Sequence, residues 1–196
     1  TIEIADSGTE QADILSLIKD HWHDIGVGLF IKPTSLEVLR RRTFAGMTMM
    51  TLAKGVENGL ASPKTSPAGF APTSQIQYQW SGWGQYFETA GQSGVAPDMP
   101  QAIELLANYR KWAQATSTQA KSEAWRQILA INSDYLFTIG LLAGTSQPIV
   151  AAASLRNVPE EAIWNWDPGA HFGVYRPDLF WFDDEARRQG EAGRRP

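Results

Sequence analysis

The sequence contains no cysteine, which excludes disulfides, thiolate metal sites and thiol catalysis but is compatible with any cell compartment. No apolar run approaches the roughly 18–20 residues that a membrane-spanning helix requires. Basic charge is also scarce, since 17 Lys+Arg stand against 21 Asp+Glu for a net charge of −4. Nucleic-acid or anionic-membrane binding is therefore disfavoured as the main function, because both use clustered basic side chains.

Signatures of catalysis and of cofactor binding are missing as well. The chain has no GxGxxG, GxxxxGK[ST], HExxH or GxSxG motif. His21 and His23 are two residues apart in an expected helix and point in roughly opposite directions, and His171 has no further ligand set beside it. Acidic residues that a glycosidase could use occur without a spacing that selects a pair, among them Glu88, Asp98 and Glu104. We therefore expect no catalytic residue, no metal site and no cofactor.

The first 52 residues alternate between strand-like and helix-like patterns. Apolar periodicity and capping residues predict strands and helices in the order 2–4 (strand), 14–25 (helix), 27–31 (strand, broken by Pro33), 36–46 (helix, with Leu36 inward) and 47–52 (strand). This β-α-β-α-β order favours an α/β fold with parallel strands joined by helical crossovers.

The remaining chain changes character twice. Residues 54–100 are rich in Pro, Gly and Ser and predict a long loop with aromatic residues at 78–87. A helical period then returns over 101–112, with Ile103, Leu106, Tyr109 (or Arg110) and Trp112 on one face. A second helical stretch over 118–132 is capped by Thr118 and has Trp125, Ile128, Leu129 and Asn132 about a turn apart. Two apolar runs at 136–142 and 148–153 read as strands, and 155–182 reads as irregular.

The aromatic segment gives the clearest local signal of function. Trp80, Trp83 and Tyr86 are spaced by three, with small or polar residues between them. Exposed Trp and Tyr faces suit stacking on peptides, sugars or other flat groups. The alternative is that they pack a small core beneath the loop or form an interface.

Several stretches occur in an order that resembles the second lobe of family 5 extracellular solute-binding proteins, the dipeptide- and oligopeptide-binding components of ABC transporters. They are ILSLIKDHWHDIGV (14–27), the strand 47–52, GWGQYFETAGQSG (82–94) with Pro97, Ile139-Gly140, LRNVP (155–159) and YRPDLFW (175–181). Together they extend over nearly all of residues 1–183.

The resemblance implies one α/β lobe of a type II periplasmic-binding-protein fold: an open, mostly parallel sheet flanked by helices, with a long aromatic loop. The lobe would span 1–183, with 184–196 as a frayed tail, and the N-terminal lobe and export signal would lie upstream of Thr1. The implied protein is not an enzyme and is periplasmic, in a Gram-negative bacterium. It captures a small solute, a peptide above others, and delivers it to a membrane permease without binding nucleic acid.

Ligands of open α/β sheets bind at the carboxyl ends of the strands, where this chain places Lys54 and then the aromatic segment. The expected ligand-binding residues are therefore Trp80, Trp83, Tyr86, Lys54, Trp164 and Trp166. An acidic residue, which the family often uses to hold a peptide terminus, is missing just after Leu52. Two alternatives stay open: a sensory or chaperone-like binding module on the same fold, and a carbohydrate-active enzyme or peptidase fragment.

Overall fold

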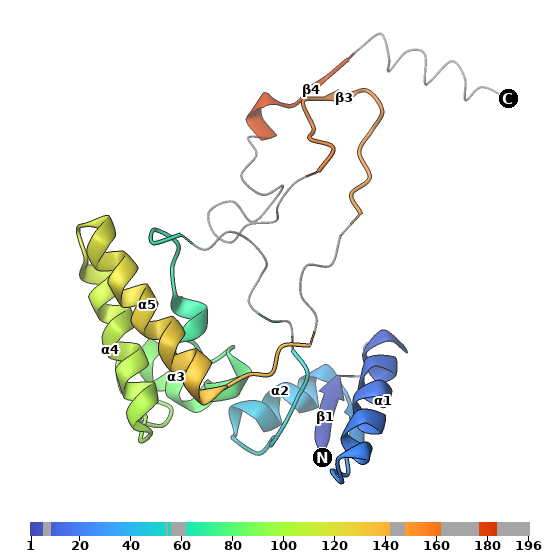
Figure 1. Ribbon diagram of the computed structural model, residues 1–196, viewed down its shortest axis with the longest axis vertical. Coiled ribbons are helices and arrows are strands. Elements are labelled where there is room, and N and C mark those ends of the chain that lie inside the picture. Colours follow the sequence, from blue (N-terminus) through green and yellow to red (C-terminus); the bar gives the residue numbers. More distant parts are fainter. Residues whose placement is uncertain (6–8, 54, 56–61, 142–147, 162–176, 184–196) are drawn as a thin grey trace, which may run out of the picture. The chain divides into compact units, whose positions relative to one another are not determined.

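The computed structural model describes residues 1–5, 9–53, 55, 62–141, 148–161 and 177–183. The described part is mixed α/β, with a parallel pair of strands, an antiparallel pair and five α-helices (Figure 1). Contacts divide the chain into two units, which we describe separately: a first unit of residues 1–55 with 66–138, and a second unit formed by the described residues of 56–65 and 139–196. The binding-protein lobe over 1–183 stays a prediction.

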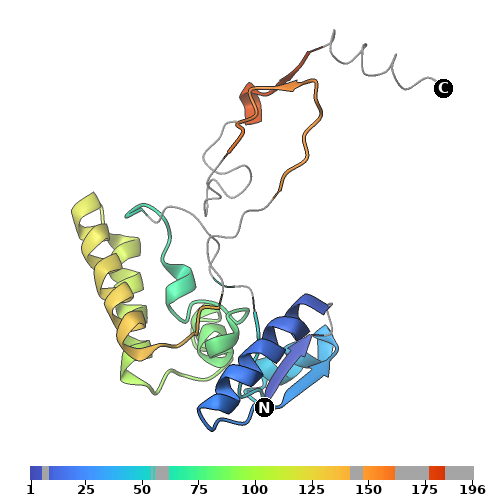
Figure 2. The same cartoon turned by 45° about the vertical axis from the view of Figure 1, so that its right-hand side comes forward.

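The first unit opens with the β-α-β order that the sequence predicts. Strand β1 (Ile2–Ala5) leads to helix α1 (Thr9–Asp24) and to strand β2 (Ile31–Thr34), which pairs with β1 in parallel. Helix α1 lies alongside β1 (Figures 1 and 2). Apolar side chains of these elements and of the segments beside them form one buried cluster, made of Ile2, Ile4, Leu15 and Leu29, against which Ile18, Trp22, Ile31, Met50 and Leu52 pack.

The second strand is predicted at residues 27–31, and this position is wrong. Strand β2 begins at Ile31, the last residue of that range, and continues through Pro33. Pro33 lies opposite Ile4 in the parallel register. The carbonyl of Phe30 accepts a hydrogen bond from the N–H of Ile2 at 2.8 Å. Since alternate residues of a strand face the same neighbour, the ring nitrogen of Pro33 faces away from β1. Proline therefore removes no hydrogen bond from the ladder and does not break the strand.

The third predicted strand, 47–52, is only partly formed. Thr51 makes a single parallel bridge to Glu3, and the N–H of Glu3 donates to the carbonyl of Met50 at 3.0 Å. Strand β1 is therefore contacted on both edges, by β2 and by this segment. The three stretches run in the same direction, as the β-α-β-α-β prediction requires.

Helix α2 (Leu36–Phe44) connects β2 to this third segment. The side chain of Ser35 caps it by accepting a hydrogen bond from the N–H of Val38 at 3.3 Å. Leu39 is buried, as the periodicity predicts, whereas Leu36 is exposed instead of facing inward. The first turn is thus fixed by the cap rather than by burial of its first apolar residue.

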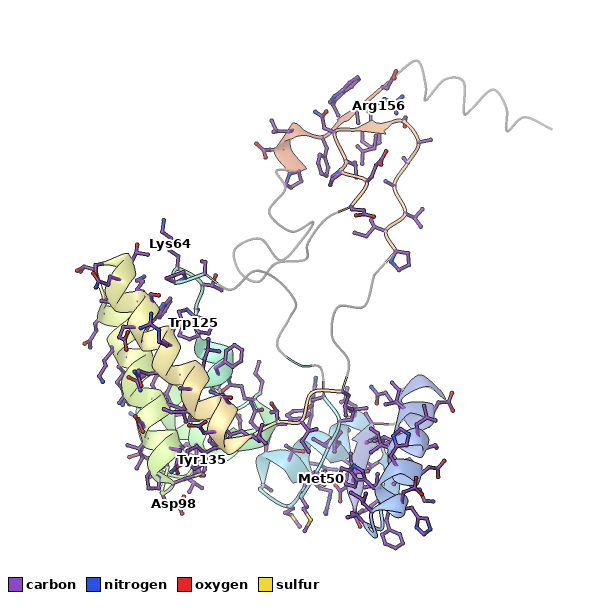
Figure 3. The ribbon with its side chains drawn as sticks, in the orientation of Figure 1. Met50, Lys64, Asp98, Trp125, Tyr135 and Arg156 are labelled. Carbon is purple, nitrogen blue, oxygen red and sulfur yellow. The ribbon has the colours of Figure 1, made fainter. Side chains whose placement is uncertain are left out.

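Two long helices form an antiparallel pair, α4 (Pro100–Gln114) and α5 (Thr118–Tyr135). Figure 3 shows Asp98, just before α4, at the same end of the pair as Tyr135, the last residue of α5. The predicted cap of α5 is displaced by one residue, because the side chain of Ser117 accepts from the N–H of Ala120. Both helices otherwise follow the sequence prediction.

The buried faces of this pair differ from the predicted ones in detail. Trp125 and Ile128 are buried as expected, but Leu129 is exposed. On α4 the buried stripe runs through Leu105 and Leu106, and Ile103 is 51% exposed. Leu105 packs with residues from α5 and from the segment before α3 in a second cluster, made of Ala71, Trp80, Leu105, Ile128 and Ile131 and lined by Phe70, Trp83, Tyr109 and Phe137. Helix α4 packs both against α5 and against the segment before α3, and its buried stripe is therefore rotated away from Ile103.

The strand predictions for 136–142 and 148–153 are wrong over their described residues. Leu136 ends α5 in a left-handed conformation, and neither run forms a strand there. In the second unit, strand β3 (Leu155–Arg156) instead pairs antiparallel with β4 (Trp181–Phe182). The guanidinium of Arg156, in β3, binds the carboxylate of Asp183, which follows β4, at 2.9 Å and so links the ends of the two strands.

Candidate functional site

The aromatic segment predicted as a loop is a helix, α3 (Ser81–Glu88), preceded by the 3₁₀ turn Tyr78–Trp80. Its glycines lower helix propensity, which is why the sequence reads as a loop. Gly84 has a packing role, because a Cβ built there would lie 2.1 Å from the carbonyl oxygen of Ser74. The glycine therefore marks a close approach of two backbones.

The segment that α3 packs against is held by the side chain of Gln77. Its Oε1 accepts from the N–H groups of Thr73 and Ser74 at 3.0 Å each, and from Nε1 of Trp80 at 2.9 Å. Its Nε2 donates to the carbonyl of Ala68 at 2.6 Å. One amide side chain thus organises the turn that positions the first aromatic residue.

Glu88 at the end of α3 anchors the same turn from the other side. Its carboxylate accepts from the hydroxyl of Ser74 and from the N–H of Gln75. These hydrogen bonds to the charged form lower the pKa of Glu88. A glycosidase acid needs a raised pKa instead, so this environment suits an ionised anchor.

The three aromatic residues expected to form a cleft wall have different surroundings. Trp80 is 5% exposed and belongs to the second cluster, with its ring 5.3 Å from that of Phe137. Trp83 is half-buried and packs against the same cluster. Trp80 thus takes the core role that the sequence left open. Tyr86 is the member of the trio that lines a surface groove.

This groove lies between α3 and α4 and has a volume of about 340 Å³. We call it the α3–α4 groove. Its lining residues come from the end of α3, the segment that follows it and the first half of α4, and they are Tyr86, Phe87, Ala90, Gly91, Pro97, Ile103, Leu106 and Arg110. Arg110 is the charged side chain among them. The groove therefore offers an apolar surface with one cation.

The segment after α3 forms a firmly bonded wall of the groove. The hydroxyl oxygen of Thr89 lies 2.8 Å from the carbonyl oxygen of Gln85 and 3.0 Å from that of Ser93, so its one proton can be donated to either. The N–H of Gly91 donates to the carbonyl of Tyr86 at 2.8 Å. Gly91 adopts φ +85°, and a Cβ there would lie 3.2 Å from the phenol of Tyr86. Glycine thus allows the tyrosine ring to lie close against the wall.

The cation of the groove is held over an aromatic ring. The guanidinium carbon of Arg110 lies 5.5 Å from the centre of the Phe87 ring, within the range of a cation–π contact. The Phe87 ring meets that of Tyr109 edge-on at 5.7 Å. The ring contacts orient the guanidinium while its N–H groups stay available to an acceptor.

The other residues that the sequence singles out fall into two groups. Lys54, Trp164, Trp166 and His171 lie outside the described residues. His21 and His23 are exposed in the last turn of α1. In the part of the chain that the structure describes, no three His, Cys, Asp or Glu side chains gather as metal ligands.

Sequence reasoning missed Phe87, Ile103 and Arg110 as groove residues. The sequence places Phe87 in the aromatic segment without a role of its own, and the periodicity predicts Ile103 on the core face. The available signal is the spacing of Ile103, Leu106 and Arg110, which places all three on one face of α4. The contact between Arg110 and Phe87 has no local sequence signal, because Phe87 lies on another helix.

A charged cluster in the β-sheet is a second place where polar groups gather. Glu3 is 6% exposed and binds Nε of Arg42 at 2.8 Å and Nζ of Lys32 at 3.3 Å, with the hydroxyl of Thr48 at 3.2 Å. Hydrogen bonding by Arg42, opposed by burial and aided by Lys32, lowers the pKa of Glu3 to about 2. The carboxylate of Glu3 thus has three side-chain partners, and the cluster ties β1 to β2 and α2.

We expect the stability of the protein to depend on Glu3 at low pH. A lowered folded-state pKa stabilises the fold above the ordinary value of 4.5, and this contribution disappears as the pH falls towards about 2. Glu3→Gln should lower the melting temperature at pH 7 and reduce its change between pH 4.5 and 2. The matched control is Glu123→Gln, which removes an exposed ion pair with Arg126. Parallel melting curves of wild type and Glu3→Gln throughout this pH range would contradict the assignment.

Comparison with known proteins adds no family assignment. No family model matches the sequence, and no curated protein matches it. Within the described residues, every helix is too short or too polar to cross a bilayer.

Proposed function

We propose that this protein is the substrate-binding component of an ABC importer. It captures a small solute, a peptide above others, in a cleft between two lobes and delivers it to the membrane permease. The proposal includes an exported, periplasmic location and a non-catalytic role. It rests on the sequence resemblance together with one structural observation, the α3–α4 groove that contains Tyr86 and Arg110.

The geometry supports ligand capture in two ways. The groove volume of about 340 Å³ falls at the lower end of the roughly 300–1,000 Å³ typical of small-molecule sites. The groove is open on one side, so a second lobe is needed to bury the ligand fully. Hinge closure of two lobes supplies such burial in binding proteins. The hydrogen bonds that lower the pKa of Glu88 also disfavour this residue as the general acid of a glycosidase.

The proposal is tested by uptake. Deleting the gene in its host should lower the uptake of a labelled tripeptide, Ala-Ala-Leu, by at least about tenfold, and the wild-type gene should restore it. Tyr86→Ala should restore it poorly, whereas Tyr135→Ala, an exposed tyrosine at the end of α5, should restore it fully. Melting curves of both variants check that each one folds.

Two results would overturn the proposal. One is tripeptide uptake that is unchanged in the deletion strain. The other is turnover of a glycoside or peptide by the purified protein that disappears when a single carboxylate, such as Glu104, is replaced. Either result would favour the sensory or enzymatic alternatives.

A further inference from the structure

We infer that the α3–α4 groove binds the C-terminal residue of a peptide. Arg110 takes the terminal carboxylate, and the apolar lining takes a hydrophobic last side chain. The inference rests on the proposed function for the class of solute, a peptide. The groove itself supplies which end of the peptide is bound and what side chain is favoured.

The apolar half of the groove has a surface without a partner in the first unit. Ile103 is 51% exposed although its helix buries a neighbouring stripe, and Phe87 and Pro97 line the groove beside it. Covering such a side chain removes apolar area from water, which favours an aliphatic or aromatic ligand group. The limited volume suits one side chain rather than an extended segment.

The charged half of the groove selects an anion. Arg110 is exposed, and its neighbours in the groove include no carboxylate. A guanidinium presents a planar fork of N–H donors that matches the two oxygens of a carboxylate. The contact with Phe87 at 5.5 Å limits the orientations of that plane. A peptide amide or a basic terminus would leave the fork without a charged acceptor.

The groove needs little rearrangement to bind. The N–H of Val95 donates to the carbonyl of Gly82 at 3.0 Å, and the N–H of Ser93 donates to the hydroxyl of Thr89 at 2.9 Å. These bonds fasten the wall to α3 from both sides of Gly94, whose φ is +87°. A wall fixed before binding lowers the entropic cost of ordering it.

The test compares a peptide acid with its amide on the full chain. Ligand-observed NMR titration with N-acetyl-Ala-Ala-Leu should show weak binding, with the free acid at least about tenfold tighter than the C-terminal amide. Arg110→Gln should bring the acid to the level of the amide and leave the amide unchanged. Arg126→Gln replaces an exposed arginine on α5 outside the groove and should preserve the preference.

Further probes test two points: whether the groove prefers a hydrophobic last side chain, and whether the bound acid is a peptide or a fatty acid. N-acetyl-Ala-Ala-Ser acid should bind several-fold more weakly than the leucine peptide, and Ile103→Ser should remove that difference. Octanoate that binds tenfold more tightly than the leucine peptide would overturn the assignment to a peptide. Equal binding of acid and amide, or an acid preference that survives Arg110→Gln, would overturn the role of Arg110. These results are independent of the uptake measurement, so each hypothesis can fail alone.

Discussion

Gly84→Ala is expected to lower the free energy of unfolding by about 3 kcal/mol or more, the upper part of the range for an overpacked site. The added Cβ would lie 2.1 Å from the carbonyl oxygen of Ser74, 2.2 Å from its carbonyl carbon and 2.8 Å from the backbone nitrogen of Gln75. These are backbone atoms, so no side-chain rotation relieves the contact. Helix α3 has to move away from the turn that Gln77 and Glu88 hold. Differential scanning calorimetry measures the effect.

Gly82→Ala is the matched control in the same helix. A Cβ at Gly82 would lie 3.5 Å from a side-chain carbon of Val95, which is an ordinary van der Waals contact. Because alanine favours a helix by up to about 1 kcal/mol over glycine, this variant should be neutral or slightly more stable. Equal melting temperatures for the two variants would contradict the close approach of α3 to Ser74.

Trp80→Ala is expected to cost about 3–5 kcal/mol, as for other large aromatic residues in a core. Trp80 is 5% exposed, packs with Leu105 and Ile128, and donates its indole N–H to Gln77. Its removal leaves a cavity between α4, α5 and the turn before α3. A fall in melting temperature of about 10 °C or more is the expected result for a chain of this size.

Trp112→Ala is the matched comparison for Trp80→Ala, because Trp112 is a tryptophan outside the buried cluster. Trp112 is half-buried, stacks on Tyr109 at 6.2 Å and receives Lys121 over its ring at 4.7 Å. Contacts of this kind contribute about 0.5–1.5 kcal/mol each, so the loss should be clearly smaller than for Trp80. If Trp80→Ala instead melted like the wild type and weakened peptide binding, Trp80 would be a ligand platform and not a core residue.

Helix periodicity carried most of what the sequence predicted correctly. Helices α1, α4 and α5 can be located from the periodic spacing of their apolar residues, because each helix buries one face. Trp125 and Ile128 of α5, for example, are buried as expected. Which residues of α4 are buried depends on the two elements that pack against it, helix α5 and the segment before α3. Ile103 and Leu105 are equally apolar in the sequence, and only the packing of Trp80 decides between them.

Glycine and proline caused the clearest errors, because their roles depend on tertiary contacts. Gly84 suggested a loop, although it allows α3 to approach Ser74. Pro33 suggested the end of a strand, although its nitrogen faces an edge where no donor is needed. Neither contact can be read from neighbouring residues in the sequence.

The aromatic pattern picks out Tyr86, a residue that lines the groove, and the ligand-binding role expected of it stays a prediction. Arg110 and Phe87 are brought together by the packing of α3 beside α4, which no sequence spacing encodes. Lys54, Trp164 and Trp166 stay predictions.

The position of Pro33 also affects how molecules of this protein meet one another. The outer edge of β2 presents a ring nitrogen at the point where a strand from a second molecule would need a hydrogen-bond donor. Exposed edges that offer regular donors are the usual starting points of intermolecular sheet growth. At this edge of the described sheet, Pro33 therefore removes one of the donors that the addition of a strand from a second molecule would use.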